Sequence, residues 1–261
     1  DRAYQVSTLV ILARHEARRA SKSLVPRLIF VLMAVGLASF LRNTWDVASI
    51  LVDTNGVDGS QQVVPGMGVL FAFVVLIYFG YTAFDDFGFG MWDRLRASGV
   101  RSFSTLTAKA LIMGVHIVLH LGLVFAFGAL VLDLHVAGAW WMIVVLILAT
   151  ALVAVAYAFM AFSLSRSNAL YNAFCYVGAL ALTALGGGLV PFPLLPDWAQ
   201  TIGPATPTYW AVQGFQHVAT GAADASLLLR HVGMLVLFAA VFTGIGVWRY
   251  DPDADREAFA L

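Results

Sequence analysis

Six long apolar segments constrain the fold of this chain more than any other feature of its sequence. Each approaches or exceeds the ~20 residues that an α-helix needs to cross the hydrocarbon core of a bilayer. Apolar residues fill them continuously rather than at alternate positions, which favours helices over the strands of a membrane barrel. The sequence therefore predicts an all-α integral membrane protein with six transmembrane helices, at about residues 24–41, 64–87, 108–132, 139–163, 169–190 and 226–248.

The composition agrees with a chain that lies mostly in lipid. Charged residues make up 11% of it and the mean hydropathy is +0.84, whereas soluble domains carry about 25% charged residues. A formal net charge of zero gives no electrostatic reason to bind nucleic acid. The sequence contains neither a G-x-x-x-x-G-K-[ST] phosphate loop nor an H-E-x-x-H zinc motif. We therefore expect no catalytic residues, and no ATP hydrolysis by this chain itself.

The basic residues predict how the chain is oriented in the membrane. All but two of the 15 Lys and Arg residues fall on one side of the predicted spans. The exceptions are Arg42 and Arg230. Because basic residues are enriched in cytoplasmic loops, both termini and the loop after the second span are expected in the cytoplasm. An even number of spans agrees with this orientation, because it places both termini on the same side of the membrane.

The loop at 84–101 has the pattern of a short amphipathic helix. Phe84, Phe87, Met91 and Leu95 have the spacing of one helix face, charged residues occupy the remainder, and Gly99 ends the pattern. One interpretation is a helix that lies on lipid headgroups. The other is a helix on which a cytoplasmic partner docks. The candidate docking residues are Phe84, Asp85, Asp86, Phe87, Met91, Trp92, Arg94, Leu95 and Arg96.

The segment at 191–217 cannot form one continuous helix. Five prolines between 191 and 207 interrupt it, yet it contains short, aromatic-rich helical patterns. Non-helical backbone at membrane depth is tolerated where it is buried in protein or faces water. We expect short re-entrant or interfacial helices that form an outer gate; the alternative is an interfacial loop without a gating role. The candidate gate residues are Pro191, Pro196, Trp198, Pro207 and Tyr209.

Two further patterns bear on function. Residues 4–22 predict an amphipathic helix parallel to the inner membrane surface, with Arg14, Arg18 and Lys22 repeating at every fourth position. His116 and His120 are one helical turn apart in the third span. That spacing suits zinc, but no Asp, Glu or Cys lies in the same turn, so we expect a buried, hydrogen-bonded pair and no metal site.

Two stretches resemble the permease subunit of type-2 ABC exporters. These permeases typically read E-x-G-T-x-x-x-L-x-x-x-P after the second span, followed by a Lys at the start of the third. Here Gly90, Leu95 and Lys109 match, Gly99 stands where Pro is usual, and the Glu is replaced. A second family pattern, G-x-x-x-P-x-x-x-L-P-x-W followed by N-P-x-x-Y, matches between 187 and 209, with Thr206 in place of Asn.

The resemblance covers nearly the whole chain and implies a single ABC-2 type transmembrane domain over 1–261. It implies that 84–101 contains the coupling helix, which docks with the N-terminal helix on two separate ATPase subunits. Those subunits, and not this chain, would bind ATP and Mg²⁺. A second permease, identical or related, would complete the pathway. Candidate pathway residues are chosen by the span in which they lie and by the chemistry of their side chains. They are Tyr78, Tyr81, Asn172, Phe174, Tyr176 and Thr183.

The expected function is export of an apolar or amphipathic drug, lipid or glycolipid-like substrate across a bacterial plasma membrane. The pathway would be all-helical, with aromatic side chains and few charges. Two alternatives stay open. The six spans could form a channel or facilitator that works without an ATPase. They could also form a membrane scaffold that transports nothing.

Overall fold

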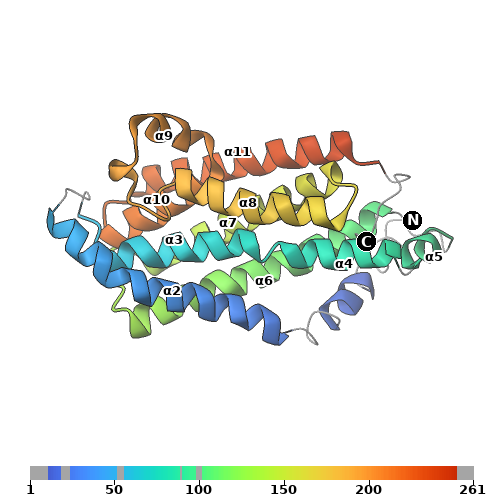
Figure 1. Ribbon diagram of the computed structural model, residues 1–261, viewed down its shortest axis with the longest axis horizontal. Coiled ribbons are helices and arrows are strands. Elements are labelled where there is room, and N and C mark those ends of the chain that lie inside the picture. The colour runs from blue at the N-terminus through green and yellow to red at the C-terminus, as the bar shows by residue number, and fades with distance from the viewer. Residues whose placement is uncertain (1–10, 19–23, 52–55, 89, 98–101, 252–261) are drawn as a thin grey trace.

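The computed structural model describes residues 11–18, 24–51, 56–88, 90–97 and 102–251. This part of the chain is helical and contains no β-strand (Figure 1). A helical segment at 11–18 comes first. It is followed by α2 Leu24–Leu51, α3 Gly59–Val74, α4 Ile77–Gly88, α5 Met91–Ala97, α6 Ser102–Val131, α7 Trp140–Leu164, α8 Asn168–Leu185, α9 Asp197–Ile202, α10 Pro207–Thr220 and α11 Ala225–Arg249, with short 3-10 helices at Phe192–Leu194 (η1) and Gly203–Ala205 (η2).

The all-α, six-span prediction is confirmed. Within the described residues, six helical stretches are long and apolar enough to cross a membrane. Most of the helices extend beyond the predicted limits, and α2 continues to Leu51. The fifth span instead ends at Leu185, five residues before its predicted end. It ends there because Gly186 caps α8 and Gly187 has a φ of 81°, a left-handed conformation that only glycine adopts readily.

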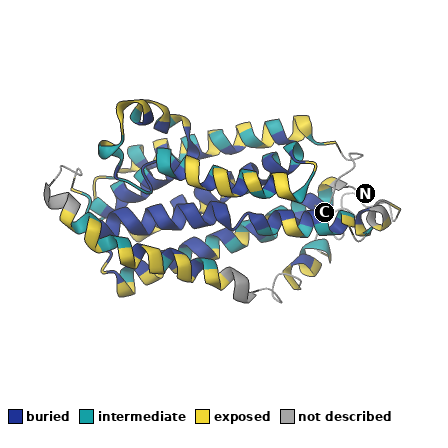
Figure 2. Cartoon of the chain, viewed as in Figure 1, coloured by how far each residue is buried: buried dark blue, intermediate teal, exposed yellow. Residues whose placement is uncertain are grey.

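The second span forms the centre of the bundle. It runs from Gly59 to Gly88, and 94% of the residues in an apolar stretch of 18 residues within it are buried. Figure 2 shows α3 dark along almost its whole length. Helices α2, α6, α8 and α10 pack around α3, while α7 and α11 pack along each other. The outer faces of α2, α8 and α11 carry exposed apolar side chains, as expected of surfaces that contact lipid or another membrane subunit.

The second span is interrupted at Val75 and Leu76, between α3 and α4. Hydrogen bonds there run between residues three apart, such as Phe79 N–H to the Leu76 carbonyl. That carbonyl also accepts a hydrogen bond of 2.7 Å from the Tyr171 hydroxyl of α8. Tyr171 therefore gives this carbonyl a second hydrogen bond and connects α8 to the interruption.

The two ends of the bundle differ in character. One end carries α5, the helical segment at 11–18, the turn between α7 and α8 and the end of α11 (Figure 1). The other end carries the end of α2, the connection after α6 and the whole of η1, α9 and η2. Of the predicted N-terminal helix, residues 4–10 and 19–22 lie outside the described residues.

Candidate functional site

Lys109, near the start of α6, is buried within an ion cluster, and its side chain is only 1% exposed. Its Nζ is 2.7 Å from Asp86 Oδ2 on α4 and 2.8 Å from Glu16 Oε1 in the helical segment at 11–18. It also donates to the Thr82 carbonyl at 3.1 Å. These acceptors engage all three N–H groups of the ammonium. This Lys109 cluster therefore ties three separate parts of the chain together at the end that carries α5.

Aromatic side chains attach α5 to the bundle beside this cluster. The Trp92 ring is 2% exposed and lies 4.7 Å from the Phe87 ring, centroid to centroid. Phe84 is fully buried and packs 5.2 Å from Phe162 of α7. Buried aromatic pairs contribute about 0.5–1.5 kcal/mol beyond the area that they bury. Displacement of α5 would therefore act directly on the end of α4.

A glycine forms the joint between α4 and α5. Gly90 has a φ of 64°, and its N–H donates to the Phe87 carbonyl at 3.1 Å. The prediction that Phe84, Phe87, Met91 and Leu95 share one helix face is wrong. The first two end α4 and the last two belong to α5, because the left-handed residue changes the direction of the chain between them.

We expect Gly90→Ala to lower stability through the backbone alone. A Cβ at this position would meet nothing within 4 Å, so the cost is the ~1–2 kcal/mol of a left-handed alanine. The measurement is the thermal midpoint in lipid nanodiscs. The control is Gly122→Ala, in the middle of α6, where a Cβ also meets nothing. Equal midpoints for both variants would contradict a left-handed joint.

The predicted docking residues fall into distinct environments. Those that are exposed can meet a partner, whereas those that are buried hold the segment in place. Buried are Phe84, Asp86 and Trp92; half-buried are Asp85 and Phe87; exposed are Met91 and Arg94; the side chains of Leu95 and Arg96 lie outside the described residues. Docking by this segment stays a prediction.

The ion pair between Lys109 and Glu16 was not predicted from the sequence. A usable signal was present, because Glu16 is an acid among the basic residues at 14–19. A Lys inside an apolar span also requires a partner in the fold. Neither signal says which acid pairs with which base, since 93 residues separate Glu16 from Lys109.

At the end of the bundle opposite α5, the segment at 191–217 divides into a surface part and a buried part. In the surface part, Trp198 of α9 is 62% exposed, as suits a membrane interface. In the buried part, Tyr209 is half-buried, with its ring 4.7 Å from that of Phe192. Pro191 and Pro207 are buried, and Pro196 is exposed where it precedes α9. The gating role of these residues stays a prediction.

Helix α10 re-enters the bundle, where it contacts α3, α7, α8 and α11. Thr206 caps its start by accepting a hydrogen bond from the Tyr209 N–H at 3.3 Å. Threonine and asparagine are both good N-cap residues. The replacement of the family's Asn by Thr206 therefore preserves the start of this helix.

The predicted pathway residues are distributed between an open face and the interior. Tyr81 of α4 and Tyr176 of α8 are 41% and 44% exposed, and Tyr78 lies beside Tyr81. Half-buried Phe174 lines an apolar groove of about 410 Å³ along α8. Thr183 is fully buried against the turn at 186–188. Asn172 is half-buried, and its Oδ1 has no hydrogen-bond partner within the described part of the chain.

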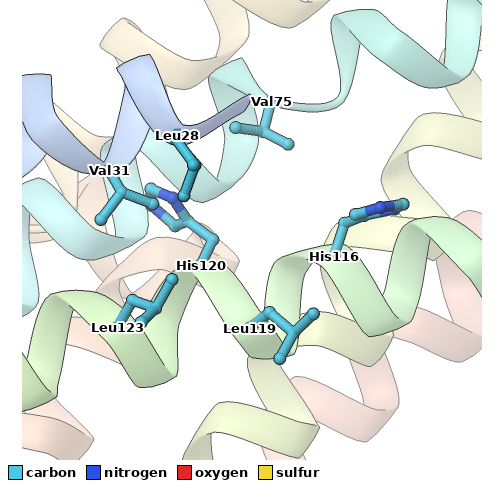
Figure 3. Close-up of a pocket in the computed structure, with 7 residues that line it drawn as sticks. All are labelled: Leu28, Val31, Val75, His116, Leu119, His120 and Leu123. Carbon is cyan, nitrogen blue, oxygen red and sulfur yellow. The ribbon is translucent and has the colours of Figure 1, made fainter. Parts of the chain in front are cut away.

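The two histidines of α6 do not form the expected hydrogen-bonded pair. His120 is buried and points toward Leu28 and Val31, while the His116 ring lies apart from it (Figure 3). Both histidines line an apolar cavity of about 90 Å³. Neither ring nitrogen of His120 has a hydrogen-bond partner among the described residues. The structure brings together no group of three or more potential metal ligands within those residues.

The sequence was compared with known protein families and with curated proteins. A family model described as ABC-2 family transporter protein matches residues 23–248, which is most of the chain. This chain belongs to the ABC-2 transporter family. This match confirms the resemblance to ABC-2 permeases that the two motifs indicated. No curated protein gives a significant match to the sequence.

Family membership and the fold together assign the chain's general role. This ABC-2 permease is a multi-pass membrane protein and a transport subunit, and such subunits are generally not catalytic themselves. The family normally works with ATPase partners. The Lys109 cluster and α5 lie at one end of the bundle, and α10 lies toward the other.

Proposed function

We propose that this ABC-2 permease exports an apolar or amphipathic molecule, such as a drug, a lipid or a glycolipid. Two separate ATPase subunits bind ATP and Mg²⁺ and dock on α5 and on the helical segment at 11–18. The Lys109 cluster is the observation that carries this proposal. It links the helical segment at 11–18 to α4 and α6 through a buried charge. Beside it, Trp92 packs α5 against Phe87 at the end of α4, so both docking elements move with α4.

The coupling step follows from the packing around α5. When the ATPase subunits close on ATP, they press on the exposed side of α5, which includes Met91 and Arg94. Trp92 and Phe87 transfer that displacement to α4. Because the second span is interrupted at 75–76, α4 tilts while α3 keeps its place among the surrounding helices. Tyr171 on α8 follows, since its hydroxyl bonds the interruption.

The export pathway lies between two copies of the permease or between this chain and a related one. The tyrosines of α4 and the apolar groove along α8 form an open face without a charged side chain among its described lining residues. Aromatic and aliphatic walls of this kind suit apolar or amphipathic cargo. Lipid alone would cover the same face in a monomer.

We propose that the permease lies in the cell membrane. The family resemblance suggests that this is the plasma membrane of a bacterium. The basic loop around α5 and the basic N-terminal lead are assigned to the cytoplasm by the positive-inside rule. Both chain termini are assigned to that side as well. The outer segment with α9 then faces the exterior.

Charge reversal on the exposed side of α5 tests the docking. Arg94→Glu is expected to lower both co-purifying ATPase and ATP-dependent transport at least tenfold, because like charges across an interface cost several kcal/mol. The matched control is Arg166→Glu, exposed in the turn between α7 and α8 at the same end of the bundle. Mass analysis of intact complexes and transport into vesicles are the measurements.

The outcomes separate the alternatives. Loss of ATPase in Arg94→Glu but not in Arg166→Glu supports docking at α5. Equal losses in both variants would assign these arginines to lipid contacts. Transport that continues without any ATPase would indicate a channel or facilitator. A stable assembly with neither ATPase nor transport would indicate a scaffold.

A further inference from the structure

A partly polar pocket lies at the outer end of the bundle, on the far side from α5. It has a volume of about 240 Å³ and lies between the first turn of α3, η1 and α10. Pro191, Phe192 and Pro193 give it an apolar wall. Its polar lining includes Gln213, His217 and Thr220, which α10 presents. None of the described lining residues is charged, so the pocket does not suit a simple anion or a simple cation.

A chain of three glutamine amides ends in this pocket, and its direction is fixed. Gln62 donates to the Gly187 carbonyl at 2.8 Å, and a carbonyl can only accept. Gln62 Oε1 must therefore face a donor, which is Gln216 Nε2 at 2.7 Å. Gln216 Oε1 in turn accepts from Gln213 Nε2 at 3.0 Å. Gln213 is left with its carbonyl oxygen and one N–H to offer the pocket.

A second chain, of two histidines, also leads to the pocket. His231 Nδ1 lies 3.0 Å from the Trp210 carbonyl and must donate to it. With both rings neutral, His231 Nε2 accepts from His217 Nδ1 at 3.1 Å, which leaves His217 Nε2 as an acceptor. Burial lowers the pKa of His217, which favours this neutral form.

The two chains end on the same face of one helix. Gln213 and His217 are four residues apart on α10 and are therefore neighbours along that face. Thr220 continues it, and its hydroxyl already donates to the Gln216 carbonyl at 3.0 Å, so its oxygen can only accept. The pocket thus offers three acceptors and one amide N–H beside an apolar wall.

We propose that this outer pocket binds a neutral, hydroxyl-rich group, namely a sugar or glycerol moiety. Its hydroxyls donate to Gln213, His217 and Thr220, one of its oxygens accepts from the Gln213 N–H, and its C–H face packs against the prolines and Phe192. The source is either the headgroup of a glycolipid or a free sugar. This binding does not depend on ATP-driven export, so it is tested without the ATPase subunits.

The experiment measures equilibrium binding to the permease in phosphatidylcholine nanodiscs. The probes are diglucosyl-diacylglycerol, free maltose and, as a cationic comparison, dodecyltrimethylammonium. Gln213→Met and His217→Phe each remove an acceptor, and the loss of one or two hydrogen bonds is expected to weaken sugar binding about tenfold. Thr201→Val, on exposed α9 at the same end of the bundle, should leave binding unchanged.

A measurement on the unsubstituted chain tests the proposal even if the variants fail to fold. Histidine labelled with ¹⁵N should report a shift of the His217 Nε2 resonance on addition of the sugar probe. Binding of the glycolipid alone assigns the site to a lipid headgroup, and binding of maltose assigns it to a free sugar. The proposal is overturned if neither sugar probe binds. Unchanged binding in both acceptor variants, or binding of the ammonium probe instead, would also overturn it.

Discussion

Lys109→Met is expected to destabilise the permease by about 3–5 kcal/mol, which is the cost of breaking a buried ion pair. Methionine keeps the length of the side chain but leaves Asp86 and Glu16 buried beside each other without the ammonium that they share. The measurement is the thermal midpoint of the purified permease in nanodiscs. A second readout is the ATPase that co-purifies with it.

The matched control uses a basic residue with two acidic partners at the surface. Arg42 pairs with Asp46 at 3.6 Å and with Asp133 at 3.3 Å, and its side chain is 29% exposed. Exposed pairs contribute about 0–1 kcal/mol, so Arg42→Met should change the midpoint little. If Lys109→Met were as mild as this control, the Lys109 cluster would not be the buried link that we describe.

Neutralising the whole cluster separates stability from coupling. Lys109→Met combined with Glu16→Gln and Asp86→Asn removes all three charges, so no unpaired buried carboxylate remains. Stability should then recover in part, because a buried neutral amide costs less than an unpaired buried charge. If the cluster also couples the segment at 11–18 to the membrane helices, ATP-dependent transport should stay low in this variant. Recovery of both would limit the cluster to a structural role.

The spans were predictable because lipid imposes a simple rule on sequence. A helix that crosses a bilayer needs a continuous apolar run, and each run marks one span whatever its neighbours are. The end of the fifth span was harder to predict from the sequence. The run of apolar residues continues to 190, but the left-handed Gly187 stops the helix at Leu185. Hydropathy does not record backbone conformation.

The sequence indicated which segments to consider as candidate sites, but it did not indicate their contacts. Spacing and motifs identified the loop at 84–101 and the outer segment. They did not reveal that Phe84 and Trp92 face inward, that Lys109 pairs with Glu16, or that Gln62 and Gln213 belong to one hydrogen-bonded chain. These contacts join helices far apart in sequence, and periodicity describes only neighbours within one helix.

Gly66→Ala is expected to be among the most damaging single-methyl changes in the half of the permease that lies away from α5. Helix α3 passes the turn at 186–188 so closely that a Cβ on Gly66 would overlap the Gly188 carbonyl oxygen. That atom is backbone, so no side chain can rotate away to make room. Overpacking of this kind costs about 1–3 kcal/mol and sometimes more.

The same substitution in an open helix provides the control. Gly36→Ala, in α2, places a Cβ where nothing lies within 4 Å, and alanine favours a helix by up to ~1 kcal/mol over glycine. We expect a lower thermal midpoint for Gly66→Ala and an equal or higher one for Gly36→Ala. Because the turn at 186–188 also supplies the Gly187 carbonyl that orients the glutamine chain, Gly66→Ala should weaken sugar binding in the outer pocket as well. An unchanged midpoint in Gly66→Ala would mean that α3 and this turn do not meet backbone to backbone.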